Sequence, residues 1–330
     1  MTLSVAVPRW FVDKIVNKNA GIRNPELRQI INKWLGRYGK LFAPLTFGCE
    51  EVCGGYSCCY DNAIRQIRML RDALMRLHSL EELRIKMLIL HTEYQIPMWW
   101  CSEFVNRYVR AITRVVKELR SINIGREVSN LVIEVHPGFG SPNKSMDLKP
   151  IAHGIKRLIT GVINDVRSNG FKLMVTVESR SSSSTISKRE QAAATIDRLE
   201  ELRKLVEDEL KDFGIPVASV IDVPQLITGY AKVKKVEKPK AVEYVINEVL
   251  KYMNERGNKV GEIHVHWYKD SKNLRNPHAP IPCDAWNAVY KPIITELSKL
   301  NNDVTIVPEI TMFKANDLLK TLSLIREQIT

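Results

Sequence analysis

The feature of this sequence that most restricts its fold is a repeated alternation of short apolar runs with longer amphipathic segments. Seven apolar runs have the length and composition of buried strands, at residues 41–47, 86–90, 131–135, 173–177, 218–221, 262–265 and 304–307. The segments between them repeat apolar residues with helical spacing, and several end at Gly or Asn. Repeated strand–helix units build either an open doubly wound sheet or a closed barrel.

The length of 330 residues suits one large α/β barrel of about 250 residues with additions. We therefore expect an α/β fold of the (β/α)8 TIM-barrel type over residues 41–330. Its eighth strand is either the run LSVAVP at residues 3–8 or absent. Residues 1–40, with the helix-like stretch PELRQIINKWLGRYG, are expected to form an N-terminal helical extension. No GxGxxG or GxxxxGK loop is present, which argues against a dinucleotide-binding or P-loop domain.

Membrane and secretion signals are absent from the sequence, so a cytoplasmic protein is expected. No apolar run reaches the ~18 residues that span a bilayer, and the first residues become charged too soon for a secretory signal. Four of the six cysteines lie together in GCEEVCGGYSCCYD, as Cys49, Cys53, Cys58 and Cys59. Their spacing matches no strong zinc or iron–sulfur pattern, and reduced thiols or a thermophile's disulfide are simpler interpretations.

The carboxyl ends of the expected strands carry mostly carboxylates and imidazoles. One such group ends every strand from the second onward and another follows the sixth, giving His91, His136, Glu178, Asp222, His266, His278 and Glu309. In βα barrels these ends form the mouth that holds the active site. Several carboxylates and imidazoles in one mouth repel one another or lose hydration unless a cation compensates them. The mixed ligands favour one to three divalent ions, Zn²⁺ or Mn²⁺.

Strand alternation adds two further groups to this mouth. Residues i and i+2 of a strand share a face, so Glu134 points inward with His136, and His264 with His266. The residue nearer the strand end is the better placed ligand, which favours His266 over His264. Glu134 and His264 are then either groups that orient the ligands or a buried polar pair.

Basic and aromatic residues follow the same strands. The formal net charge of +12 suits an anionic partner such as nucleic acid, and equally a thermophile's lysine-rich surface. The basic residues chosen as candidate phosphate contacts are Arg180, Lys232, Lys234, Lys235, Lys272 and Arg275. For any one loop, a solvated lysine run is an equal interpretation. Trp99 and Trp100 would either stack on an unpaired base or pack under the mouth.

The order of these residues resembles the xylose-isomerase-like barrel superfamily, and within it the endonuclease IV and UV damage endonuclease types of DNA-repair nuclease. In that family the motif HPG, here at residues 136–138, ends a strand, and its histidine binds zinc. Other similar stretches are VESR, IDVPQ, HVHWYKDSK, NPH and IVPEI. The resemblance assigns to metal binding Glu178, Asp222, His266, His278 and Glu309. Gln225 and Asn276 depart from the family, which has a metal-binding His and an Asp there.

Three functions fit these residues. The first, favoured by the resemblance, the surplus histidines and the positive charge, is a metal-dependent phosphodiesterase acting on abasic or UV-damaged DNA. Its catalytic residues would be Glu178 and Glu309, with Glu178 bridging metal ions or orienting the attacking water. The alternative is a metal-dependent sugar isomerase or epimerase, in which carboxylates move a proton next to a carbonyl. A second alternative is a non-catalytic nucleic-acid-binding relative with an incomplete metal site.

Overall fold

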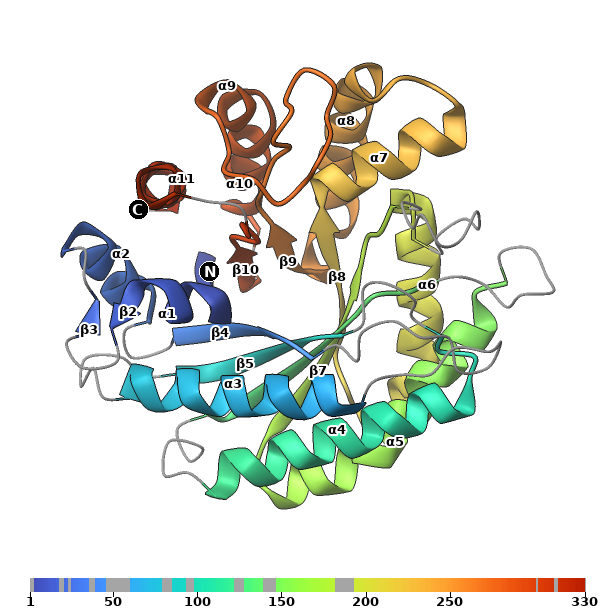
Figure 1. The fold of residues 1–330 in the computed structure, drawn as a ribbon. Coiled ribbons are helices and arrows are strands. Elements are labelled where there is room, and N and C mark those ends of the chain that lie inside the picture. Colours follow the sequence, from blue (N-terminus) through green and yellow to red (C-terminus); the bar gives the residue numbers. More distant parts are fainter. Residues whose placement is uncertain are drawn as a thin grey trace.

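Among the residues that the structure describes, eight parallel strands close into a barrel (Figure 1). This computed structural model describes residues 3–17, 21–22, 25–35, 39–45, 60–78, 85–92, 98–121, 128–138, 147–181, 193–300, 302–311 and 314–329. Around the barrel the strands lie in the order β1-β10-β9-β8-β7-β6-β5-β4. Their bounds are β1 Leu3–Pro8, β4 Gly39–Pro44, β5 Ile85–His91, β6 Asn130–Val135, β7 Lys172–Glu178, β8 Val217–Asp222, β9 Val260–His264 and β10 Val304–Val307. The expected TIM-barrel fold is confirmed, and its parallel strands all end at one mouth.

The eighth strand of the barrel comes from the N-terminal part of the chain. β1 pairs with β10 through Leu3 and Val304, and with β4 through Val7 and Leu41, so it closes the sheet on itself. The apolar and β-branched residues of LSVAVP suit a strand with a neighbour on each side. The expected domain boundary at residue 40 is therefore corrected, because a separate extension ending there would take one strand out of the barrel.

Helices cover the outside of the barrel (Figure 1). The α-helices are α1 Arg9–Ile15, α2 Pro25–Leu35, α3 Tyr60–His78, α4 Ser102–Ser121, α5 Lys149–Ser168, α6 Ile196–Leu210, α7 Val223–Lys234, α8 Lys238–Arg256, α9 Cys283–Ala285, α10 Lys291–Leu297 and α11 Ala315–Ile329. Short elements are β2 Val16–Asn17 and β3 Gly21–Ile22, which pair with each other, η2 Lys211–Phe213, η3 Gly257–Lys259 and η4 Trp286–Tyr290. In α4, buried apolar residues recur every three to four positions from Phe104 to Leu119, which gives that helix one face for packing.

Two apolar layers hold the barrel together. The larger lies between strands and helices and includes Leu41, Leu88 and Leu131, one from each of three successive strands. The smaller consists of Ala6, Phe42, Ile89, Val132 and Val307, whose positions alternate with those of the first set. This second set therefore fills the inside of the barrel. The small size of the interior apolar set leaves room in the barrel for buried polar groups.

The strands expected after residue 85 are confirmed to within two residues at each end. The first expected strand, 41–47, is confirmed as β4 over residues 41–44, while residues 46 and 47 lie outside the described part of the chain. The four clustered cysteines, Cys49, Cys53, Cys58 and Cys59, also lie outside the described residues. Within the described ranges no helix is both long and apolar enough to cross a membrane.

Candidate metal centre

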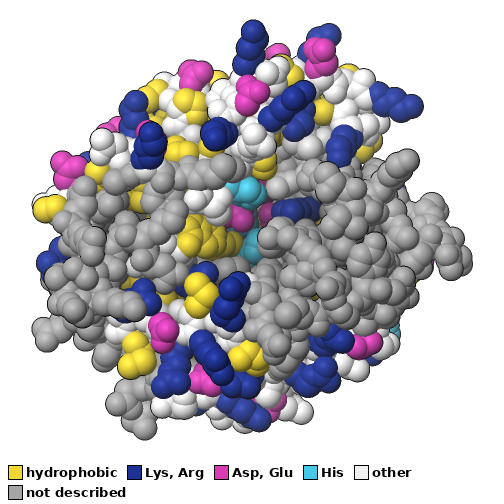
Figure 2. Space-filling model, viewed as in Figure 1, with side chains coloured by type: hydrophobic (Ala, Val, Ile, Leu, Met, Phe, Trp, Pro, Cys, Tyr) yellow, Lys and Arg dark blue, Asp and Glu magenta, His cyan; other side chains and the backbone are white. Residues whose placement is uncertain are grey.

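The barrel mouth collects the carboxylates and imidazoles that the sequence places at strand ends. His91, Glu178, Asp222 and His264 are the last residues of β5, β7, β8 and β9. His136 follows β6 directly, and Glu309 lies two residues beyond β10. All six are buried, with exposures between 0% and 8%. Figure 2 shows histidine and acidic side chains together at the centre of a hollowed face, with a basic side chain next to them.

A central cluster contains Glu178, Asp222, His264 and Glu309, whose potential ligand atoms all lie within 4.8 Å of one another. His264 Nδ1 is 3.3 Å from a Glu309 oxygen and 3.5 Å from a Glu178 oxygen. It is also 4.0 Å from Asp222 Oδ2. One imidazole nitrogen thus faces three carboxylates from three different strand ends. Three carboxylates and one imidazole make a four-ligand set of the kind that binds divalent transition metals.

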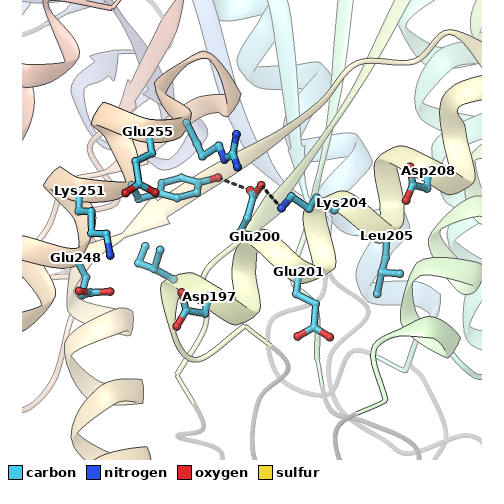
Figure 3. A pocket seen from close by; sticks show the side chains of 12 residues that line it. Asp197, Glu200, Glu201, Lys204, Leu205, Asp208, Glu248, Lys251 and Glu255 are labelled. Carbon is cyan, nitrogen blue, oxygen red and sulfur yellow. Dashed lines mark hydrogen bonds and ion pairs between the residues drawn. The ribbon is translucent and has the colours of Figure 1, made fainter.

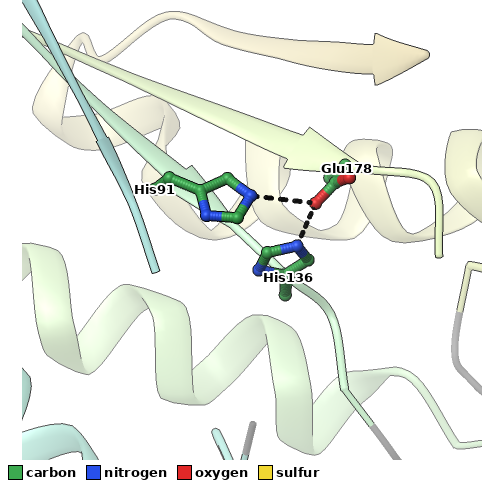
Figure 4. Close-up of side chains that lie close together, drawn as sticks. All are labelled: His91, His136 and Glu178. Atoms are coloured by element: carbon green, nitrogen blue, oxygen red, sulfur yellow. Dashed lines mark ion pairs between the residues drawn. The ribbon is translucent and has the colours of Figure 1, made fainter. Parts of the chain in front are cut away.

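A second cluster shares Glu178 with the first and adds His91 and His136 (Figure 4). His91 Nε2 lies 3.7 Å from Glu178 Oε2, and His136 Nε2 contacts the same oxygen. His136 Nδ1 is 3.1 Å from the Thr92 carbonyl oxygen, which can only accept a hydrogen bond. The Thr92 carbonyl therefore favours a neutral His136 with its proton on Nδ1, which leaves Nε2 free to bind a metal ion. This is the tautomer that a histidine ligand needs at Nε2.

A third cluster contains His266, His278 and Glu309, but the nitrogens of His266 already have partners. His266 Nδ1 accepts a hydrogen bond from the His278 backbone N–H at 3.1 Å, which puts the ring proton on Nε2. Nε2 then donates to Asp222 Oδ2 at 3.0 Å. The expected preference for His266 over His264 depended on a strand that runs past residue 264. β9 ends at His264, so His264 faces the central carboxylates and His266 lies behind Asp222.

The buried charges of the central cluster fit a bound cation. The two carboxylate oxygens of Glu178 and the two ring nitrogens of His264 make no hydrogen bond within the described part of the chain. Burial opposes ionisation of Glu178 and Glu309, yet the neighbouring histidines hold the pKa of both carboxyls well below the usual value. Burial also opposes charge on His264, but Glu134, Glu178 and Glu309 raise its pKa. Positive charge therefore balances the carboxylates here, as imidazole protons or as a metal ion.

The candidate nucleic-acid contacts differ in burial and in position. Trp99 is fully buried, and its Nε1 donates to the His136 carbonyl oxygen at 2.6 Å, so packing under the mouth is its role. Trp100 is half-buried against the core. Arg180 Nη1 lies 3.4 Å from His136 Nε2, beside the metal-ligating candidates. The other basic candidates are exposed, at the end of α7 and in the loop after β9: Lys232, Lys234, Lys235, Lys272 and Arg275.

Several polar residues of the site were missed from the sequence. Glu262 is buried two residues before His264 and accepts a hydrogen bond from Thr176 Oγ1 at 2.9 Å. The i, i+2 rule that singled out Glu134 also identifies Glu262, which was overlooked. Lys40 donates a hydrogen bond to Thr305 Oγ1 at 2.6 Å, and no pattern in the sequence indicates this contact. Gln225 does not point into the metal cluster. Its side-chain oxygen accepts a hydrogen bond from the Ser181 hydroxyl, and its backbone N–H donates to Asp222 Oδ1.

A separate groove lies outside the barrel between α6 and α8 (Figure 3). It encloses about 540 Å³ and is lined by charged side chains of both signs. Tyr252 donates to Glu200 at 2.9 Å on its wall, and Arg203 binds the same carboxylate. These polar groups bind one another, so we interpret the groove as a solvated contact between two helices.

No protein-family model and no curated protein sequence matches this chain. Solved structures match it over almost its whole length. A xylose isomerase domain protein from Alicyclobacillus acidocaldarius subsp. acidocaldarius is 10% identical, with a TM-score of 0.51, over 99% of this chain and 98% of that chain. A D-allulose 3-epimerase from Methylomonas sp., in complex with D-allulose, is 11% identical, with a TM-score of 0.51, over 99% and 97%. These similarities confirm the barrel fold, whereas closeness to DNA-repair nucleases is not shown.

These comparisons correct the expected activity on damaged DNA. Both similar structures are of proteins named for sugar isomerisation or epimerisation, which agrees with the alternative drawn from the sequence. The burial of Trp99 removes the stacking contact on which part of the nuclease hypothesis depended.

Proposed function

We propose that the protein is a divalent-metal-dependent isomerase or epimerase that acts on a small sugar. The observation that carries this proposal is the position of two carboxylates, Glu178 and Glu309, which come from different strand ends and both face Nδ1 of His264 in one buried cluster. Moving a proton at the carbon next to a carbonyl needs a base, and returning it to the other face needs a second acid. Two carboxylates in one mouth supply that pair.

The metal would be held by Glu178, Asp222, His264 and Glu309, with Zn²⁺ and Mn²⁺ both suited to this ligand set. It would supply Lewis-acid polarisation of the substrate oxygens, which acidifies the neighbouring C–H group. Asp222 is fixed for this role by the backbone N–H of Gln225 at 2.9 Å and by the ring of His266 at 3.0 Å. Such support keeps a ligand within the narrow geometry that catalysis requires.

The remaining side chains of the mouth orient the two carboxylates. His278 Nδ1 lies 3.4 Å from Glu309 Oε2, and its ring contacts that of His266 in a tilted arrangement with centroids 4.4 Å apart. His278 has a φ of 66°, a conformation that costs a non-glycine residue energy and is often kept at functional sites. On the other side, His136 contacts Glu178 and is itself held by Thr92. Each proposed base therefore has one imidazole that can stabilise its charged form.

The test is proton exchange at carbon, followed by NMR in D₂O. The protein, loaded with Mn²⁺ or Zn²⁺, is incubated with a panel of ketoses and aldoses. Deuterium is expected to enter next to the carbonyl of one substrate, with a new epimer or isomer appearing, and chelator is expected to abolish both. The Glu178→Gln variant should lose the exchange, whereas Glu201→Gln, on the outer face of α6, should retain it. A metal-loaded protein that exchanges no sugar proton would refute the proposal.

A further inference from the structure

We propose that Glu134 is a positioning residue that fixes the ring of His264 with Nε2–H toward Glu134 and Nδ1 toward the metal. This inference rests on the proposed metal site. Glu134 is on β6, two residues before His136, and its side chain is completely buried. Its Oε1 lies 3.1 Å from His264 Nε2.

The contact between Glu134 and His264 crosses the inside of the barrel. β6 and β9 are not neighbours, because β7 and β8 lie between them. The two side chains can therefore meet only in the interior, below the central cluster. His264 then has a carboxylate on each side: Glu134 at Nε2, and Glu178 and Glu309 at Nδ1.

The position of one proton decides whether His264 can bind a metal at Nδ1. A neutral imidazole carries its proton on either nitrogen, and only the other nitrogen has a lone pair. Without Glu134, a proton on Nδ1 would be stabilised by Glu309, 3.3 Å away, and would block the ligand position. A carboxylate at Nε2 favours the opposite tautomer. It also makes the imidazole a stronger ligand, as hydrogen-bonded carboxylates do for metal-bound histidines.

Glu134 has no other bond that would explain its burial. Neither of its oxygens makes a hydrogen bond within the described residues, and its second close imidazole, His91, is 3.8 Å away. A carboxylate without partners is costly in an interior, and an imidazole N–H directed at it reduces that cost. The distance of 3.1 Å from Glu134 Oε1 to His264 Nε2 suits a hydrogen bond, and a metal ion at Nδ1 would strengthen it by making Nε2–H more acidic.

Glu262 offers a matched comparison in the same layer. It is a buried carboxylate on β9, with Oε1 bound by Thr176 Oγ1 at 2.9 Å. Its ligand atoms also lie within 4.8 Å of those of Glu134 and His264. Removing its charge changes the electrostatics of the layer without removing the group that faces His264 Nε2. Comparing variants of Glu134 and Glu262 therefore distinguishes a specific contact with His264 Nε2 from a general effect of removing a buried charge.

The experiment measures metal affinity and imidazole tautomer without any sugar. Zn²⁺ affinity is determined by competition with a chelator for the native protein, Glu134→Gln, Glu134→Leu and Glu262→Gln. We expect Glu134→Leu to weaken Zn²⁺ binding 10- to 100-fold and Glu134→Gln to weaken it less, since the amide oxygen can still accept a hydrogen bond from His264 Nε2–H. Glu262→Gln should change the affinity less than about threefold. Imidazole ¹⁵N shifts, recorded above the raised pKa of His264 so that the ring is neutral, should report Nε2–H in the native apoprotein and a mixture of tautomers in Glu134→Leu.

Two results would overturn the inference. One is a Zn²⁺ affinity of both Glu134 variants within about threefold of the native value; the other is an equal loss in Glu262→Gln. Thermal unfolding of each apoprotein checks that the fold is retained, and if Glu134→Leu does not fold, Glu134→Gln and its ¹⁵N shifts decide the outcome. Because no sugar is present, failure of the proposed isomerase activity leaves this test unaffected.

Discussion

Replacing Trp99 by Phe is expected to destabilise the protein through the end of β6 without changing any group that faces the mouth. Trp99 is fully buried, and its ring contacts Phe104 and Tyr108 edge-on or tilted, with centroids 5.1 and 5.5 Å apart. Its indole N–H donates to the His136 carbonyl oxygen at 2.6 Å. Phenylalanine keeps an aromatic ring in this packing but provides no donor.

The magnitude follows from two losses. The unpaired carbonyl of His136 costs about 1–3 kcal/mol, because it is buried and loses its partner. The smaller ring leaves a void that costs about 1 kcal/mol more. The expected decrease in the free energy of unfolding is therefore about 2–4 kcal/mol. In a chain of this size each kcal/mol lowers the Tm by roughly 2–4 °C.

The assay is thermal unfolding by circular dichroism at a fixed Zn²⁺ concentration, with Trp100→Phe as the comparison. Trp100 is only half-buried, so its variant should lose less stability. An unchanged Tm for Trp99→Phe would refute the hydrogen-bond argument. Loss of ligand binding at an unchanged Tm would show instead that the indole is a contact surface, which is the role that the structure excludes.

Three further perturbations have defined outcomes. Glu178→Gln should weaken Zn²⁺ binding, measured by chelator competition, because this carboxylate belongs to two clusters. The same variant should lower sugar proton exchange, measured by NMR, by at least 100-fold. Gly154→Ala should lower the free energy of unfolding by about 1–3 kcal/mol in a urea titration, since a Cβ there would lie 1.9 Å from the Trp99 carbonyl oxygen; no change would mean that α5 can shift freely. Partial burial opposes ionisation of Glu200, but hydrogen bonds from Arg203 lower its pKa. Its charge therefore stabilises the fold above about pH 4.5, and this contribution is lost as the pH falls below that value. The Tm difference between the native protein and Glu200→Gln should shrink between pH 6 and pH 3, and a constant difference would contradict this assignment.

Local side-chain patterns were enough to predict the main elements and most of the site. Period-two and period-3.6 repeats are set by backbone geometry within one segment, so β5 to β10 could be placed from their own residues. Parallel strands end on the same side of a barrel, and the strand-end residues Glu178, Asp222 and Glu309 were therefore expected to meet. The structure brings them within one cluster.

The parts that could not be predicted depend on which distant segments pair. β1 closes the barrel against β10, some 300 residues away, and LSVAVP alone does not determine that pairing. The choice between His264 and His266 depends on where β9 stops, which its register with β8 and β10 decides, with His264 opposite Asp222 and Val307.

The gathering of carboxylates and imidazoles at one mouth could be read from the sequence, because strand direction and alternation are properties of each segment. Which of these groups touch depends on how the strands close into the barrel. Glu134 and His264 lie on strands separated by two others, and they meet because closure of the barrel brings opposite walls together. Trp99 is buried for the same kind of reason: α4, α5 and the end of β6 pack around it, and no local pattern specifies that enclosure.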